Sequence, residues 1–426
     1  MRNKRVPDDF SKTIPDNGIR IVTRRMPHAR SVSMGVWVNV GARDERQEES
    51  GLSHFIEHMI FKGTKKRSAL EIAKQFDAIG GQCNAFTSKE NTCYHGKVMD
   101  THLDTMVDLL SDIFLNSVFD AREVERERQV ILQEIKMLED QPDEHIHVLL
   151  AQATWQGHPL GRSILGSPET VAGFDSAIIM DYFRRAYQPQ RIVISAAGNI
   201  EHNAFAELAT RAFEVVRNED NFPKRTPPTT DRVVAAYPKN LEQVHICLGT
   251  KGVPATDPRR YPCSVLNVIL GGNMSSRLFQ EIRERRGLAY AVYSFLSLYS
   301  DTGVSGVYVA VDPANTEEVL ELIMKGMKLI KEKPVEDSEL RNAKEYLKGG
   351  IYLGAESTEN QMTRLAHNEI HFGRQVSLHE VEDSIEKVTA EDILELAEDM
   401  FQKESLAVTL LGPVGDDSFH KRTWEL

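Results

Sequence analysis

The segment GLSHFIEHMIFKG contains two histidines and a glutamate whose types and spacing could bind a catalytic metal ion. If the segment forms a helix, His54 and His58 are four positions apart and present their imidazoles on the same face. Two imidazoles in this arrangement can share a zinc ion, and Glu57 then lies beside the metal without being a ligand. The same pattern can also arise by chance, and the alternative is then a pair of solvated histidines on a surface helix.

A catalytic zinc ion needs a third ligand from the protein and leaves its fourth position to water. The stretch from Ala121 to Asp140 predicts a single long helix, on which Glu127 and Glu134 are seven positions apart and share a face. Apolar neighbours turn the part of the helix around Glu134 toward a core: Val130, Ile131, Leu132 and Ile135. For the other glutamates of this helix a solvated surface is the expected environment: Glu123, Glu125 and Glu139.

A segment rich in proline, threonine and charge, residues 217–232, divides the chain nearly in half and predicts a linker between domains at 1–216 and 233–426. The two halves follow a similar order of elements at an offset of about 210 residues, which is how an internal repeat shows itself in a sequence. Strands and helices alternate in both halves, with period-two runs such as Val36, Val38 and Val40. The halves can therefore be compared position by position.

The second half lacks the metal-binding residues. A helix predicted at about residues 258–270 corresponds to the one predicted at about residues 49–61. At this offset, Ser264 and Val268 stand where the first half has its two histidines, and Gly350 falls near the counterpart of Glu134. The sequence therefore predicts that one half carries the metal chemistry and that the other has a different role.

Several motifs accompany HFIEH in order and at matching spacings, and together they resemble the pitrilysin/insulinase family of inverted-motif zinc peptidases. They are FKGT, GGQCNAFTSKENTCYH, ERERQVILQEI, HPLGRSILG, YQPQRIVISAAGNI and RERRGLAY. The resemblance covers nearly the whole chain and points to the short branch that includes the mitochondrial processing peptidase and its bacterial counterparts. It implies one zinc ion per chain, bound by His54, His58 and Glu134. It also implies that Glu57 is the general base that activates the zinc-bound water, and that Glu127 orients a ligand imidazole.

The resemblance also implies how a peptide substrate is held. Asn84 and Ala85 match contact positions on an edge strand that pairs with an extended peptide by β-augmentation, and an ordinary strand after a glycine turn is the alternative. Arg283 and Tyr290 match a pair from the C-terminal domain that contacts substrate near the zinc. There the tyrosine could donate a hydrogen bond to the developing oxyanion.

The function implied by the resemblance is that of a zinc metalloendopeptidase that cleaves unfolded peptides or presequence-like segments. Glu144 matches an acidic group that recognises a basic residue near the cleavage point, but Val148 stands where a second acid is expected. A strict preference for arginine is therefore not predicted. The alternative is a non-catalytic scaffold or binding subunit of the same fold. Relatives of that kind typically lose a ligand or the base, whereas this chain keeps all four residues.

The fold implied by the resemblance is α+β, with two similar domains, each a mostly antiparallel sheet with helices packed on one face. The first domain would bind zinc, and the second would be a homologous domain without metal that completes the substrate chamber. Larger relatives have four such domains, so a chain with two is expected to form a homodimer. In such a dimer, the metal and the pair formed by Arg283 and Tyr290 are expected to come from different chains.

Charge and composition bear on the partners of the protein, the state of its cysteines and its location. A net charge of −12 disfavours nucleic acid as a partner, and it fits either basic peptides or a solvated acidic surface. The four cysteines show no CxxC spacing, which indicates reduced thiols. No apolar run approaches the roughly 20 residues of a membrane span. Because the start shows no secretory signal, a cytoplasmic protein is expected, and Asp8 and Asp9 argue against a mitochondrial presequence.

Overall fold

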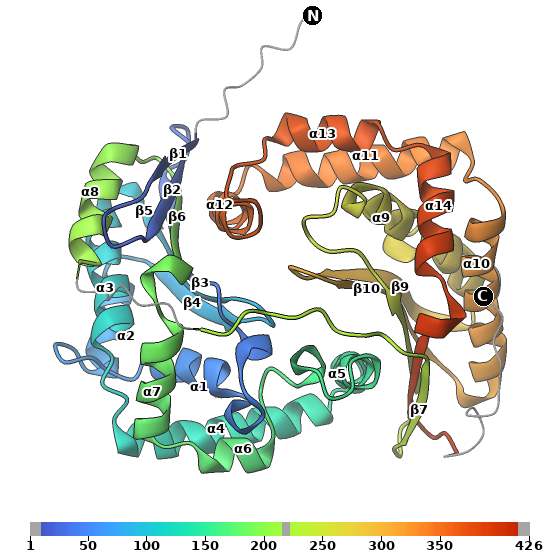
Figure 1. Cartoon of the computed structure of the whole chain (residues 1–426), viewed down its shortest axis with the longest axis horizontal. Coiled ribbons are helices and arrows are strands. Elements are labelled where there is room, and N and C mark those ends of the chain that lie inside the picture. Colours follow the sequence, from blue (N-terminus) through green and yellow to red (C-terminus); the bar gives the residue numbers. More distant parts are fainter. Residues whose placement is uncertain (1–9, 215–221, 416–426) are drawn as a thin grey trace, which may run out of the picture. The chain divides into compact units, whose positions relative to one another are not determined.

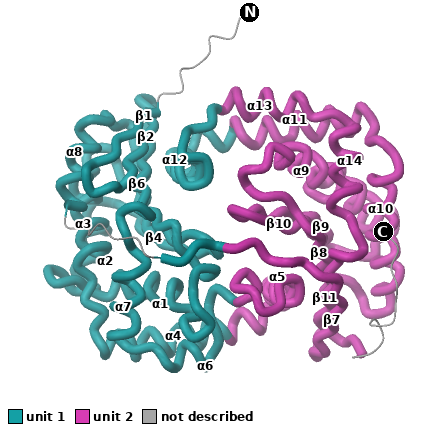
Figure 2. The backbone as a smooth tube through the Cα atoms, viewed as in Figure 1, with its two compact units in different colours: residues 1–135, 163–225, 353–377 teal, residues 136–162, 226–352, 378–426 magenta. Residues whose placement is uncertain are grey.

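The computed structural model describes residues 10–214 and 222–415, which form two compact units (Figure 2). Unit 1 comprises residues 1–135, 163–225 and 353–377, and unit 2 comprises residues 136–162, 226–352 and 378–426. The predicted linker contains the passage from unit 1 to unit 2 after Arg225, and its residues 217–221 lie outside the described residues. So do Asp8 and Asp9. The single division of the chain at this linker stays a prediction, because each unit also takes a segment from the other half.

The sheet of unit 1 has six strands in the order β1-β2-β6-β3-β5-β4 (Figure 1). The strands are β1 (Phe10–Thr13), β2 (Arg20–Arg25), β3 (Ser31–Val38), β4 (Gln82–Thr87), β5 (Thr92–Met99) and β6 (Ile192–Gly198). All neighbours are antiparallel except β2 and β6, which are parallel. Among the strands of the described residues, β4 lies at an edge of this sheet with β5 as its neighbour, and Asn84 is paired with His95.

The sheet of unit 2 has five strands in the order β7-β11-β8-β10-β9. The strands are β7 (Val233–Pro238), β8 (Val244–Lys251), β9 (Ala289–Leu298), β10 (Gly303–Val311) and β11 (Ala407–Gly412). Strands β7 and β11 are parallel and the other pairs are antiparallel. When β1 is left out, the two sheets have the same topology, because β2-β6-β3-β5-β4 corresponds strand by strand to β7-β11-β8-β10-β9. The structure therefore confirms two similar α+β domains with mostly antiparallel sheets.

Most helices of unit 1 cover one face of its sheet, and a single helix from the C-terminal half lies on the other face (Figure 1). Val36 and Val38 point into the larger core, whereas Trp37 packs on Met362 and Leu365 of the single helix, α12. The predicted alternation along β3 is thereby confirmed. The helices are α1 (Leu52–Met59), α2 (Ala69–Ala78), α3 (Leu103–Asn116), α4 (Ala121–Glu139), α6 (Pro168–Gly173), α7 (Ser176–Ala186), α8 (His202–Ala212) and α12 (Thr358–Phe372).

Unit 2 is built in the same way. Val244, Ile246 and Leu248 of β8 face its main core, while Cys247 faces Leu150 of α5, a helix from the N-terminal half. Its helices are α5 (Pro142–Thr154), α9 (Arg260–Asn267), α10 (Thr316–Glu332), α11 (Asp337–Gly354), α13 (Leu378–Glu386) and α14 (Ala390–Met400). Two π-helical segments, Val268–Gly272 and Phe279–Arg285, flank a turn before β9. None of the described helices combines the length and apolarity that spanning a bilayer requires.

Candidate metal centre

Helix α1, which carries the histidine motif, is fixed at its N-terminus by a buried carboxylate. Glu45 Oε2 accepts a hydrogen bond from the backbone N–H of Gly51, and its Oε1 accepts one from Ser53, both at 2.7 Å. A negative charge at this end also suits the helix dipole. Gly51 has φ +100°, and a Cβ there would lie 2.8 Å from the carbonyl oxygen of Leu165, so only glycine fits. The start of α1 is therefore held rigidly.

His54 and His58 of α1 lie beside Glu134 of α4, and their potential ligand atoms lie within 4.8 Å of one another. His54 Nε2 is 3.6 Å from Glu134 Oε2, and His58 Nε2 is 3.4 Å from the same oxygen. Among residues 10–214 and 222–415, this is the one group of at least three His, Cys, Asp or Glu side chains that converges in this way. Two nitrogens and one carboxylate oxygen are a donor set that zinc prefers.

The protonation of these groups also fits a bound cation. Burial, together with the neighbouring His58 imidazole, lowers the pKa of His54 to about 4, so its ring is uncharged at neutral pH. Burial opposes charge on His58, but hydrogen bonds with Glu134 and Glu127 outweigh this effect and raise its pKa. The hydrogen bond from His58 lowers the pKa of Glu134. The site thus favours a positive charge between His58 and Glu134, which a metal ion can supply in place of a proton.

Glu127 lies behind His58, on the side away from Glu134. Its Oε2 accepts a hydrogen bond from His58 Nδ1 at 3.1 Å, which leaves Nε2 of the ring directed toward Glu134. Its Oε1 is 2.6 Å from the ammonium of Lys62, and the carboxylate is 8% exposed. The sequence did not single out Lys62, because this residue lies in the turn after α1 and its contact with Glu127 depends on where that turn meets α4.

Glu57, the predicted base, points toward the end of the edge strand. Thr87 Oγ1, on the last residue of β4, donates a hydrogen bond to Glu57 Oε2 at 2.6 Å. Burial raises the pKa of Glu57, and the hydrogen bond from Thr87 partly opposes this shift. Thr87 was also missed as an individual residue, although it ends the strand that the sequence assigned to substrate binding. The edge strand and the predicted base are thus in direct contact.

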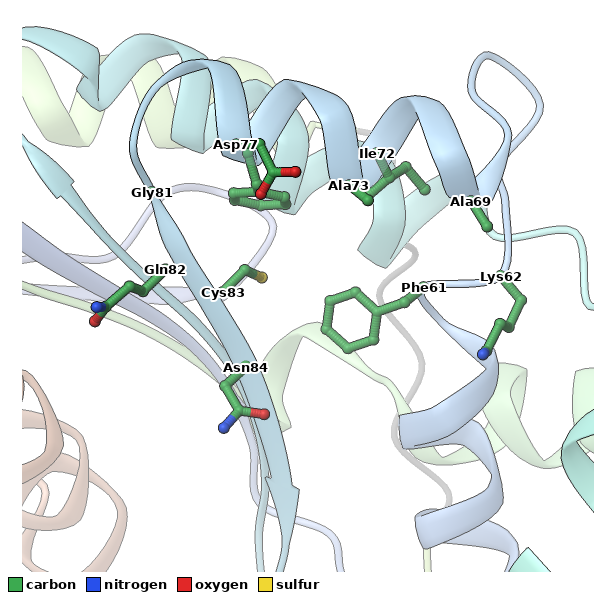
Figure 3. Close-up of a pocket in the computed structure, with 11 residues that line it drawn as sticks. Phe61, Lys62, Ala69, Ile72, Ala73, Asp77, Gly81, Gln82, Cys83 and Asn84 are labelled. Atoms are coloured by element: carbon green, nitrogen blue, oxygen red, sulfur yellow. The ribbon is translucent and has the colours of Figure 1, made fainter. Parts of the chain in front are cut away.

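A cavity of about 620 Å³ opens between the start of β4 and helix α2 (Figure 3). In Figure 3, Cys83 and the ring of Phe61 point into this space from opposite sides, and Lys62 stands at one end below Ala69. The remaining lining residues are apolar on α2 and polar at the margins: Ile72, Ala73, Phe76, Asp77, Gly81, Gln82 and Asn84. The cavity therefore offers an apolar floor beside the edge strand.

The structure distributes the other predicted site residues between the two units. Asn84 and Ala85 lie on β4, as expected for an edge strand of unit 1. Glu144 lies on α5 and belongs to unit 2. Arg283 and Tyr290 also belong to unit 2 and lie together, with the guanidinium 4.6 Å from the centre of the tyrosine ring. Tyr290 is 80% exposed and so can contact another molecule.

Comparisons with known proteins agree with this picture. Residues 20–168 match the family described as insulinase (peptidase family M16), and residues 174–347 match the peptidase M16 inactive domain. The chain is 42% identical over 400 residues to a Bacillus subtilis (strain 168) protein named "uncharacterized zinc protease YmxG", covering 94% of this chain and 97% of that protein. It is 39% identical to a "zinc protease" of Streptomyces coelicolor, covering 95% and 89%.

Solved structures share the fold at lower sequence identity. A structure described as a protease from Helicobacter pylori superposes with a TM-score of 0.88 at 21% identity, covering 95% of this chain and 99% of that one. A peptidase M16 inactive domain from Pseudomonas fluorescens superposes with a TM-score of 0.90 at 17% identity, covering 96% and 99%. At these identities the likeness concerns the fold alone.

Proposed function

Because the chain belongs to the insulinase (peptidase M16) family, we propose that it is a zinc-dependent endopeptidase that cleaves unfolded peptides. The observation that carries the proposal is the convergence of His54, His58 and Glu134, with Glu57 beside them on the same helix. A scaffold or binding subunit of the same fold is the second candidate. The intact set of potential ligands and the potential base favours the enzyme.

The residues of unit 1 have separate tasks in this mechanism. A zinc ion held by His54, His58 and Glu134 would polarise the scissile carbonyl and acidify a water molecule. Glu57 would accept the proton of the attacking water on its carboxylate and return it to the leaving amine. Its raised pKa helps it to hold that proton, and Thr87 fixes the orientation of the carboxylate.

The substrate would be held by its backbone. Among the described strands, β4 has β5 as its neighbour on one side, so its other edge would pair with an extended peptide around Asn84 and Ala85. The N–H of Ala85, which donates to Asn84 Oδ1 at 2.9 Å, would exchange this partner for the peptide. Backbone pairing of this kind makes few demands on sequence. The cavity next to β4, with an apolar floor and polar margins, would accept one side chain of the bound peptide.

Further groups would come from unit 2. We infer that Arg283 and Tyr290 contact the substrate and that Tyr290 donates a hydrogen bond to the developing oxyanion. Glu144 would favour a basic side chain near the cleavage point. The protein would act as a cytoplasmic homodimer, in which the pair from unit 2 of one chain completes the site of the other.

A direct test is to incubate the purified protein with a diverse peptide library, to identify products by mass spectrometry and to measure zinc in the same sample. Wild type should contain zinc and cleave peptides. Glu57→Gln should retain the zinc and lose at least about 100-fold in kcat, because it removes the base and no ligand. If Glu57→Gln cleaves at the wild-type rate, the mechanism is wrong. If wild type binds zinc but cleaves no peptide, the scaffold is the better assignment.

A further inference from the structure

Lys62 connects a buried carboxylate to the candidate metal centre. Its Nζ is 2.6 Å from Glu127 Oε1, while Glu127 Oε2 is 3.1 Å from His58 Nδ1. Each oxygen of this carboxylate therefore has one close partner. In the part of the chain that the structure describes, no other lysine or arginine forms an ion pair with Glu57, Glu127 or Glu134.

We propose that Lys62 is a positioning residue that holds the Glu127 carboxylate in the orientation that accepts the Nδ1–H of His58. The inference rests on the proposed function, because it assumes that zinc binds at His54, His58 and Glu134. Through Glu127, Lys62 keeps Nε2 of His58 turned toward the metal position. Lys62 touches neither the metal nor the reacting atoms in this account.

The energetics of burial give the reason. A carboxylate that is 8% exposed has lost most of its hydration, and a neutral imidazole N–H replaces only part of it. A buried charge without a counter-charge is strongly unfavourable, so Glu127 without Lys62 would turn an oxygen toward water. His58 would then lose its acceptor, and its ring would no longer be confined to one orientation and one tautomer.

The backbone around Lys62 is built to hold the side chain in place. The turn that ends α1 is closed by a hydrogen bond from the N–H of Lys62 to the carbonyl of Met59 at 3.0 Å. Gly63, with φ +120°, then reverses the chain, and its carbonyl accepts a hydrogen bond from Val118 at 3.2 Å. The next residue, Thr64, forms a bridge with Ser117. Lys62 is thus anchored on both sides before its side chain crosses to Glu127.

The proposal is tested by the affinity of the whole protein for zinc, measured by competition with a chromophoric chelator, which does not depend on cleavage. Lys62→Met should weaken zinc binding about 10–100-fold, the usual effect of losing a group that orients a ligand. Lys62→Arg should bind zinc with an affinity within a few-fold of wild type, because it keeps the positive charge. Lys65→Met is the matched control: this exposed lysine of the same segment should have no effect when changed.

A double-mutant cycle identifies the route of the effect. Glu127→Gln should also weaken zinc binding, and Lys62→Met combined with Glu127→Gln should bind zinc no more weakly than Glu127→Gln alone. Additive effects, or wild-type affinity in Lys62→Met, would overturn the proposal. If Lys62→Met does not fold, Lys62→Gln in the same cycle decides the question by the same criteria. Failure of wild type to bind zinc at all would instead refute the proposed function.

Discussion

The two units share one order of strands but differ in what equivalent helices carry. In unit 1, β3 is followed by α1, whose His54 is 6% exposed and faces Glu134. In unit 2, β8 is followed by α9, where Ser264 donates its hydroxyl to the carbonyl of Arg260 in the same helix at 2.8 Å. The hydroxyl is satisfied locally and needs no further partner. The two units thus have equivalent helices at equivalent places, and the side chains on α1 and α9 determine whether that place could bind a metal ion.

The ends of these helices differ as well. Helix α1 stops at Met59, and the following turn delivers Lys62 to Glu127. Helix α9 instead continues into the π-helical segment Val268–Gly272. A Cβ on Gly271 would lie 2.6 Å from the backbone nitrogen of Ser294 on β9, so the segment packs tightly on its own sheet. The region proposed to position a metal ligand in unit 1 therefore serves packing in unit 2.

The largest expected effect is that two inactive variants recover activity when their chains are mixed in one dimer. Glu57→Gln removes the proposed base of unit 1, and Tyr290→Phe removes the proposed oxyanion donor of unit 2. If a chain's unit 2 completes its partner's site, every mixed dimer has one intact site. Random mixing makes about half of the dimers mixed, so roughly a quarter of wild-type cleavage should return.

The measurement is peptide cleavage after the subunits are dissociated and reassociated. Two controls come first: Tyr290→Phe alone must be severely impaired, and exchange of the subunits must be demonstrated with labelled chains. Given both, the absence of any recovery would show that the two groups act within one chain or not at all.

A smaller effect is expected at the helix that covers the opposite face of the first sheet. Desolvation of the ring, together with the nearby His371, lowers the pKa of His367 on α12 to about 4, and the ring packs edge-on against Trp37 although the residue as a whole is exposed. A histidine is protonated below pH 6.5 in the unfolded chain and stays neutral in the folded chain down to about pH 4. The contribution of His367 to the free energy of unfolding is therefore present above pH 6.5 and decreases as the pH falls, and because the residue is exposed to solvent, screening keeps this loss small.

Urea unfolding between pH 7 and pH 4.5 tests this expectation. In His367→Gln, the free energy of unfolding should fall less steeply with decreasing pH than in wild type. His379→Gln, at an exposed histidine of unit 2, is the control and should leave the slope unchanged. Equal slopes for wild type and His367→Gln would show that His367 does not resist protonation in the folded state.

Much of the candidate site could be predicted because its information is local or carried by the family pattern. The spacing of His54, Glu57 and His58 on a helix sets their relative directions, and the resemblance selected Glu134 from several glutamates of α4. The structure then brings these residues together. Lys62 and Thr87 were missed because their partners depend on how a turn and a strand end meet other elements.

The arrangement of the sheets and the exchange of helices were beyond the sequence. Strand β2 pairs with β6, about 170 residues further along, and such long-range pairing leaves no trace in local periodicity. The patterns of α5 and α12 show that each has an apolar face, but not which sheet that face covers. For this reason the prediction of helices on one face of each sheet did not include α5 and α12 on the opposite faces.

The central claim is that unit 1 alone carries the metal chemistry, and zinc content tests it most directly. Zinc should be measured by inductively coupled plasma mass spectrometry in three folded proteins: wild type, His58→Ala and its counterpart in the repeat, Ser264→Ala. We predict one zinc per chain in wild type and in Ser264→Ala, and none in His58→Ala. Zinc that persists in His58→Ala, or that is lost from Ser264→Ala, would contradict the account.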